Sequence, residues 1–184
     1  MRELFFSLVS KELFIALLED GRVTKILCED NYRKHSENFI LKIREIFTSA
    51  SFSIKDLDKI FFLTGPGGQT GERVSFSFVI GSLLSSSMVK VFSMDSLTFQ
   101  AAASKECLSV ISTGEGSKKY YFTVYQNGGV LFRKEKVEEE ELKKVREMFP
   151  NLPVLADFGG INFLHNFFLC KKEFRIFESE LTRL

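Results

Sequence analysis

The hydrophobic residues at the start of this chain follow a strand-like pattern and then change to a helical one. Two apolar runs, Leu4–Val9 and Leu13–Leu18, are separated by a short polar break. A third run, Val23–Cys28, follows Asp20-Gly21, a pair typical of tight hairpin turns. Because turns this short leave no room for a crossover connection, the three predicted strands pair antiparallel. The chain must therefore begin with a three-stranded antiparallel sheet.

The next segment has the spacing of a helix that starts near Ser36. Its apolar stripe consists of Phe39, Ile40, Ile43, Ile46, Phe47 and Ala50. A strand is then expected at Lys59–Thr64, a helix at Glu72–Met88, a strand at Val89–Phe92 and a helix at Asp95–Ser104. Residues 1–104 thus have the order βββαβαβα, which is typical of an α/β fold with crossover connections.

After Cys107 the same order starts again in a shorter form. Three strands are predicted at Leu108–Ile111, Tyr120–Gln126 and Val130–Lys136, followed by a helix at Glu138–Phe149 and a short strand at Val154–Ala156. The remaining residues are apolar and rich in Phe, but their spacing favours no element. We therefore expect an N-terminal lobe over residues 1–104 and a truncated second lobe over residues 105–184.

Composition excludes several classes of function. The 184 residues carry 25 basic and 24 acidic side chains, so no net charge draws the protein to nucleic acid or anionic lipid. With 45% hydrophobic residues the chain is not disordered. Its three cysteines, far apart in sequence, indicate a reducing compartment rather than a disulfide framework. The N-terminus lacks the pattern of a signal peptide and no apolar stretch is long enough to cross a membrane, so we expect a cytoplasmic protein.

The most distinctive motif is a glycine-rich loop between a predicted strand and a predicted helix. It reads Gly65-Pro66-Gly67-Gly68-Gln69-Thr70-Gly71. Backbone N–H groups of such a loop can converge on an anion, helped by the helix N-terminus. The spacing matches neither a P-loop nor a dinucleotide fingerprint. The loop is therefore either an anion cradle or a tight turn that lets strand and helix pack closely, and spacing alone favours the turn.

A second motif, Arg33-Lys34-His35-Ser36-Glu37, opens the first helix. Its histidine could approach a phosphate or a metal, but the position four residues later is occupied by Phe39 rather than a second ligand. The preferred interpretation is a helix cap, in which Ser36 accepts backbone hydrogen bonds and Glu37 complements the helix dipole.

The helix at Glu72–Met88 has apolar residues on two faces. One face can pack on the sheet of its own lobe. The other needs a cover, which could be another helix of this chain or another protein. The sequence as a whole shows no Ser-His-Asp or Cys-His arrangement, no carboxylate pair with diagnostic spacing and no basic groove. It therefore predicts no catalytic residue and no metal site.

Together these motifs resemble a known family. The chain resembles the TsaB (YeaZ-type) subunits of the bacterial tRNA threonylcarbamoyladenosine machinery. The resemblance lies in the order of elements and in three motifs: Arg33-x-His35-Ser36-Glu37, the glycine-rich loop that extends through Thr70-Gly71 to Arg73, and Asp95-Ser96-Leu97. The resemblance covers residues 1–104 and is weak beyond them.

The resemblance implies an actin/sugar-kinase/Hsp70-like fold, also called ribonuclease H-like, without catalysis of its own. It implies a scaffold that pairs with the catalytic paralogue TsaD, on which the ATPase TsaE docks, for threonylcarbamoyl transfer to adenosine 37 of tRNA. ATP and a metal are expected in the partner subunits, none in this chain alone, and tRNA is contacted only through the complex. The expected partner-binding helix residues are Ile40, Ile43, Phe47, Val74, Phe78, Gly81 and Leu84.

Departures from the family pattern favour the same non-catalytic role. Ser7, Leu8 and Val9 stand where the family has Asp-Thr-Ser. The paralogue's His-x-x-x-His metal motif is absent, and Ser112-Thr113-Gly114 replaces Asp-Ala-Arg. The alternative is a nucleotide-dependent phosphotransferase or metallopeptidase-like enzyme of the same fold, which would need the missing acid. A homodimer of the isolated chain is compatible with the scaffold role, because an uncovered apolar face favours self-association.

Overall fold

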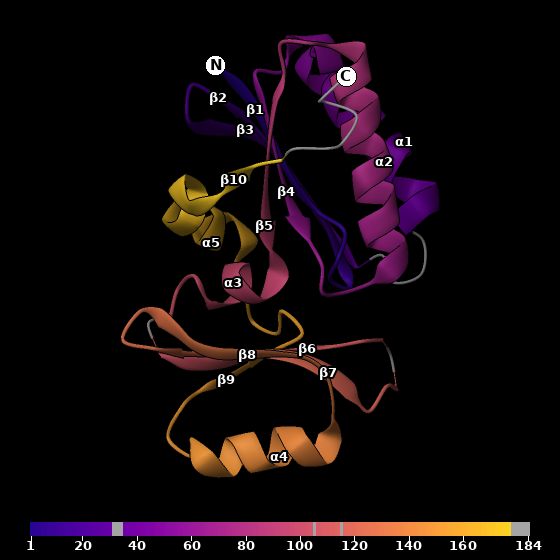
Figure 1. The fold of residues 1–184 in the computed structure, drawn as a ribbon. Coiled ribbons are helices and arrows are strands. Elements are labelled where there is room, and N and C mark those ends of the chain that lie inside the picture. Colours follow the sequence, from indigo (N-terminus) through magenta and orange to yellow (C-terminus); the bar gives the residue numbers. More distant parts are fainter. Residues whose placement is uncertain (31–34, 105, 115, 178–184) are drawn as a thin grey trace. The chain divides into compact units, whose positions relative to one another are not determined.

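The chain folds into two compact units in a computed structural model (Figure 1). The structure describes residues 1–30, 35–104, 106–114 and 116–177, without the side chains of His35 and Ser36. Unit 1 contains Met1–Thr64, Gln69–Met94 and the residues from Glu173 onward. Unit 2 contains Gly65–Gly68 and Asp95–Lys172. No described helix has both the length and the hydropathy that a membrane crossing needs.

Unit 1 is built on a six-stranded sheet with the order β10-β5-β4-β1-β2-β3. Strand β1 pairs antiparallel with β2 and parallel with β4, and β2 pairs antiparallel with β3, so the predicted opening hairpins are confirmed. The turn between β2 and β3 has left-handed backbone at Asp20 and Gly21, as the pair predicts. The strands are β1 Arg2–Ser7, β2 Glu12–Glu19, β3 Arg22–Asp30, β4 Lys59–Thr64, β5 Lys90–Asp95 and β10 Arg175–Ile176.

Two helices, α1 (His35–Ala50) and α2 (Gln69–Ser85), lie on the same side of this sheet (Figure 1). The helical stripe of α1 is confirmed at Phe39, Ile43, Ile46 and Phe47, which are buried in the core beneath the helices, but not at Ile40, which is exposed. Aromatic rings join the layers: Phe6 of β1 lies 5.0 Å from the ring of Phe39 between ring centroids. Burial of this apolar surface is the main source of stability for the unit.

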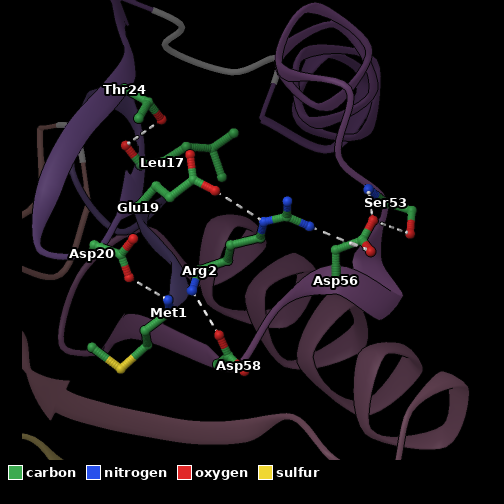
Figure 2. A network of polar contacts seen from close by, with 9 residues as sticks. All are labelled: Met1, Arg2, Leu17, Glu19, Asp20, Thr24, Ser53, Asp56 and Asp58. Carbon is green, nitrogen blue, oxygen red and sulfur yellow. Dashed lines mark hydrogen bonds and ion pairs between the residues drawn. The ribbon is translucent and has the colours of Figure 1, made fainter.

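A polar network ties the N-terminus to the beginning of the sheet (Figure 2). The Arg2 side chain pairs with Glu19 at 3.2 Å and Asp56 at 3.5 Å. The Arg2 backbone N–H donates to Asp58, just before β4. Asp56 also accepts hydrogen bonds from the backbone N–H and hydroxyl of Ser53, which form a capping box at the 3₁₀ turn η1 (Ile54–Asp56). These bonds lower the pKa of Asp56.

Unit 2 repeats the topology of unit 1, as the recurring element order predicts. Its four-stranded sheet has the order β8-β7-β6-β9, with β6 parallel to β9 and antiparallel to β7, which matches β3-β2-β1-β4 of unit 1. The strands are β6 Cys107–Ser112, β7 Lys119–Gln126, β8 Gly129–Glu138 and β9 Val154–Ala156. The helices are α3 Ser96–Ala101, α4 Glu139–Met148 and α5 Phe163–Cys170, followed by the 3₁₀ turn η2 Lys171–Glu173.

A buried amide network holds unit 2 together. The Gln100 side chain of α3 donates to the hydroxyl of Ser109 and to the carbonyl oxygen of Leu155, at 2.9 and 2.8 Å, and accepts a hydrogen bond from the N–H of Phe158. Asn166 of α5 donates to the carbonyl oxygen of Phe99 at 2.9 Å. Because buried polar groups are costly when unpaired, these bonds fix α3 against β6 and β9, and α5 against α3.

The structure divides the chain differently from the expected boundary at residue 104. Helix α3 belongs to unit 2, since Gln100 is bonded to its strands. The segment from Glu173 returns to unit 1, where Arg175 and Ile176 pair with β5. The sequence did not reveal this return, because a strand of two residues leaves no periodic signal.

Candidate protein-interaction site

The glycine-rich loop follows β4 directly and precedes α2. The hydroxyl of Ser96 donates to the carbonyl oxygen of Pro66 at 2.5 Å, so the motif Asp95-Ser96-Leu97 holds this loop. Gly65, Gly67 and Gly68 are not among the described glycines with left-handed backbone. An anion cradle here stays a prediction, whereas close packing is directly visible at the next glycine.

Gly71 lies where the backbone of α2 comes closest to the segment after β1. A Cβ atom at this position would lie 1.8 Å from the carbonyl oxygen of Leu8, so no side chain fits. The buried positions of α2 are Gly71, Ser75, Val79 and Ser82. The expectation of two apolar faces on this helix is thus corrected. Close approach of the backbones selects small residues for the buried side of α2, and Phe76 and Phe78 flank that side.

Serine hydroxyls on α2 are satisfied within the helix. Ser75 and Ser82 on the buried side donate to carbonyl oxygens four residues earlier, at 2.9 and 2.7 Å. Ser77 and Ser85 on the exposed side do the same, at 2.9 and 2.7 Å. A hydroxyl that bonds its own helix presents little unsatisfied polarity to a neighbour. The exposed side of α2 is therefore more apolar than its serine content indicates.

Large apolar side chains are exposed on both helices. On α1, Ile40 and Leu41 are 52% and 62% exposed. On α2, Leu84 is 77% exposed, and Gly81 has no atom within 4 Å of where its Cβ would lie. Met88, three residues beyond α2, is 81% exposed. We call Ile40, Leu41, Gly81, Leu84 and Met88 the helix face.

Four of the expected partner-binding residues lie elsewhere. Ile43 and Phe47 are only 5% and 7% exposed and belong to the core, which corrects the expectation that they form a partner surface. Phe78 packs edge-on against Phe6 and Phe39, at 5.5 and 5.1 Å, and Val74 also packs against the core. These four residues of the apolar stripes lie against the core and are not free to contact a partner, whereas Ile40, at the edge of the α1 stripe, is exposed.

The motif at the start of α1 is only partly described. Arg33 lies outside the described residues, and the side chains of His35 and Ser36 are not described. The described part of the helix starts at His35, and because the Ser36 side chain is not described, the expected cap stays a prediction. Glu37 occupies the first turn, where its charge complements the helix dipole. On α2, Thr70 and Arg73 are exposed.

The end of β1 and the two residues after it are buried. Ser7, Leu8 and Val9 are 0%, 0% and 3% exposed. Among the residues that the structure describes, no three His, Cys, Asp or Glu side chains are grouped so that they could hold a metal ion. In unit 2 the corresponding segment begins with Ser112, whose N–H and hydroxyl both donate to Asp157.

Unit 2 contains a polar cluster that the sequence did not reveal. Asp95 caps α3 by accepting a hydrogen bond from the N–H of Thr98, and it pairs with Arg133 at 3.4 Å. The Thr98 hydroxyl lies 3.0 Å from the Tyr125 hydroxyl, whose pKa is raised chiefly by burial. Only the Asp-x-x-Thr cap carried a sequence signal, because Tyr125 and Arg133 come from strands distant in sequence.

Comparisons with known proteins agree with this architecture. YeaZ from Pseudomonas aeruginosa superposes with a TM-score of 0.60 and 21% identity, covering 74% of this chain and 66% of that one. A second structure, of an uncharacterized protein with similarity to peptidase YEAZ from Pseudomonas aeruginosa, gives a TM-score of 0.58 and 22% identity, over 70% of this chain and 62% of that one. These likenesses show the mixed α/β fold of actin and the sugar kinases, as expected from the sequence.

Sequence relatives place the chain in a family. The tRNA threonylcarbamoyladenosine biosynthesis protein TsaB of Buchnera aphidicola subsp. Schizaphis graminum is 24% identical over 68% of this chain and 66% of its own length. The chain thus spans slightly less than two thirds of the relatives it matches. The family model described as TsaD, tRNA N6-adenosine threonylcarbamoyltransferase, matches residues 25–171, most of the chain. This chain therefore belongs to the TsaD, or tRNA N6-adenosine threonylcarbamoyltransferase, family.

Proposed function

We propose that this chain is a non-catalytic scaffold subunit of the machinery that makes threonylcarbamoyladenosine at position 37 of tRNA. In this proposal it pairs with the catalytic paralogue TsaD through the helix face, and the ATPase TsaE docks on that pair. Family membership and the relative named TsaB support the pathway. The buried end of β1 supports the absence of catalysis, because Ser7, Leu8 and Val9 offer no acidic ligand for a cation.

The observation that carries the proposal is the exposure of large apolar side chains on the helix face. Leu84 and Met88 are among the most exposed apolar residues of the chain, at 77% and 81%. Exposed apolar groups on a folded protein mark interaction sites when they gather on adjacent elements. ATP and a metal belong to the partner subunits in this proposal, tRNA is reached only through the assembled complex, and the complex works in the cytoplasm.

Co-expression with the TsaD-type paralogue, followed by size-exclusion chromatography, tests the pairing. Leu84→Glu places a charge in the helix face without touching the core, unlike a change at Phe78, so the complex should be lost while the variant stays folded. Burying an unpaired charge in an interface costs several kcal/mol, which lowers the affinity by about a hundredfold or more.

Leu131→Glu is the matched control. Leu131 is 52% exposed on β8, so this change introduces the same charge at an exposed leucine of the other unit, on an element outside the helix face. It should leave the complex intact. Equal retention of the paralogue by both variants would contradict the assignment of the helix face. Tight binding of ATP and magnesium by the isolated chain, measured by calorimetry, would instead favour an enzyme of the same fold.

A further inference from the structure

The last described residues of the chain form a short strap along the edge of unit 1. Arg175 and Ile176 pair antiparallel with Ser93 and Phe92 of β5. The Phe177 N–H then donates to the carbonyl oxygen of Val91 at 2.9 Å. We call residues 174–177 the C-terminal strap. With so few backbone bonds, the strap depends on its side chains to stay in place.

Two phenylalanines anchor the strap on opposite faces of the sheet. Phe174 is 6% exposed and meets Phe61 edge-on, with ring centroids 5.4 Å apart. Phe177 turns to the other face, where its ring lies 5.3 Å from that of Phe62 and 5.7 Å from that of Phe76. Between them Ile176 is 68% exposed. The strap therefore clamps the sheet edge between two aromatic side chains.

The contact with Phe76 connects the strap to α2, the helix that also carries Gly81 and Leu84 of the helix face. Phe62, Phe76 and Phe177 form a three-ring cluster that joins β4, α2 and the strap, with Phe62 and Phe76 at 5.7 Å. Aromatic pairs at this separation stabilise packing beyond the area they bury. In the chain, the strap continues almost directly from Lys172, the last residue of unit 2.

We propose that the C-terminal strap, acting through Phe177, positions α2 for partner binding. The inference rests on the proposed function for its binding consequence, but its structural part concerns α2 alone. Phe177 is a positioning residue in this account, since it lies on the core side of α2 and acts through Phe76.

Hydrogen exchange of the isolated full chain tests the structural part. Removing the ring with Phe177→Ala should speed amide exchange in α2 and β5 by about threefold to tenfold, the effect expected in α2 for the lost contact with Phe76. Ile176→Ala is the control, because it shortens the exposed neighbouring side chain on the same strand and should leave α2 unchanged. If Phe177→Ala does not fold, Phe177→Leu keeps an apolar side chain and should show a smaller change in the same direction.

Binding of the same variants to the TsaD-type paralogue separates this inference from the proposed function. At a temperature where all variants are folded, Phe177→Ala should bind about threefold to tenfold more weakly than wild type, Phe177→Leu should recover part of the loss, and Ile176→Ala should bind normally. Two results would overturn the proposed role of the strap: unchanged amide exchange in α2 of Phe177→Ala, or faster exchange in α2 with unchanged binding to the paralogue. If the wild-type chain does not bind the paralogue while α2 still loosens in Phe177→Ala, the proposed function fails and the hold of the strap on α2 stands.

Discussion

Two glycines on α2 look alike in the sequence and differ in what they permit. Gly71→Ala would place a Cβ 1.8 Å from the carbonyl oxygen of Leu8, and overpacking against backbone should cost about 1–3 kcal/mol or more in the free energy of unfolding. Gly81→Ala meets no atom within 4 Å and should stabilise the helix by about 0.5–1 kcal/mol. Urea unfolding measures both. Similar effects at the two sites would contradict the close approach of α2 and the segment after β1.

The carboxylate of Asp56 contributes an acid dependence to the stability of unit 1. Hydrogen bonds from Ser53 lower the pKa of Asp56 below its ordinary value of 3.8, so folding favours the ionised form. That stabilisation is present above about pH 4 and is lost as the pH falls through the lowered pKa. Asp56→Asn should therefore lower Tm at neutral pH and approach wild type in acid. A constant difference in Tm from neutral to acidic pH would contradict this.

Among the elements, α3 depends on one buried amide. Gln100→Leu keeps the approximate size of the side chain but leaves the Phe158 N–H and the Leu155 carbonyl oxygen without this partner. Each buried group left unpaired costs about 1–3 kcal/mol, so unfolding in urea should begin at a clearly lower concentration. Gln126→Leu, at the exposed end of β7, is the control and should change stability by less than about 0.5 kcal/mol. Equal effects would show that the network is not needed.

Hydrophobic spacing predicted most elements because each of them buries one regular side. The stripe of α1 and the hairpin at Asp20 and Gly21 are examples, since periodicity and turn chemistry are local properties. The same spacing misled the search for a partner surface: Ile43 and Phe47 belong to the stripe and are therefore core. Hydrogen bonds between residues far apart in the sequence, such as that from Gln100 to Leu155, leave no local pattern in the sequence.

For the whole molecule, the repeated topology was visible in the sequence, whereas the division into units was not. The order β8-β7-β6-β9 repeats β3-β2-β1-β4 because the same run of strands and a helix recurs. The return of the chain to unit 1 at Glu173 depends on Phe174 and Phe177 finding aromatic partners far away in sequence. The helix face could not be identified from the sequence either, because which apolar side chains stay exposed depends on how the chain folds.

Methionine oxidation is the most direct test of the claim that the helix face binds another protein. Met88 and Met148 are 81% and 68% exposed, one just beyond α2 and the other at the end of α4. On mixing with the TsaD-type paralogue, the oxidation rate of Met88, measured by mass spectrometry, should fall severalfold while that of Met148 stays unchanged. Unchanged oxidation of Met88 in a complex that forms, or protection of Met148 instead, would contradict the account.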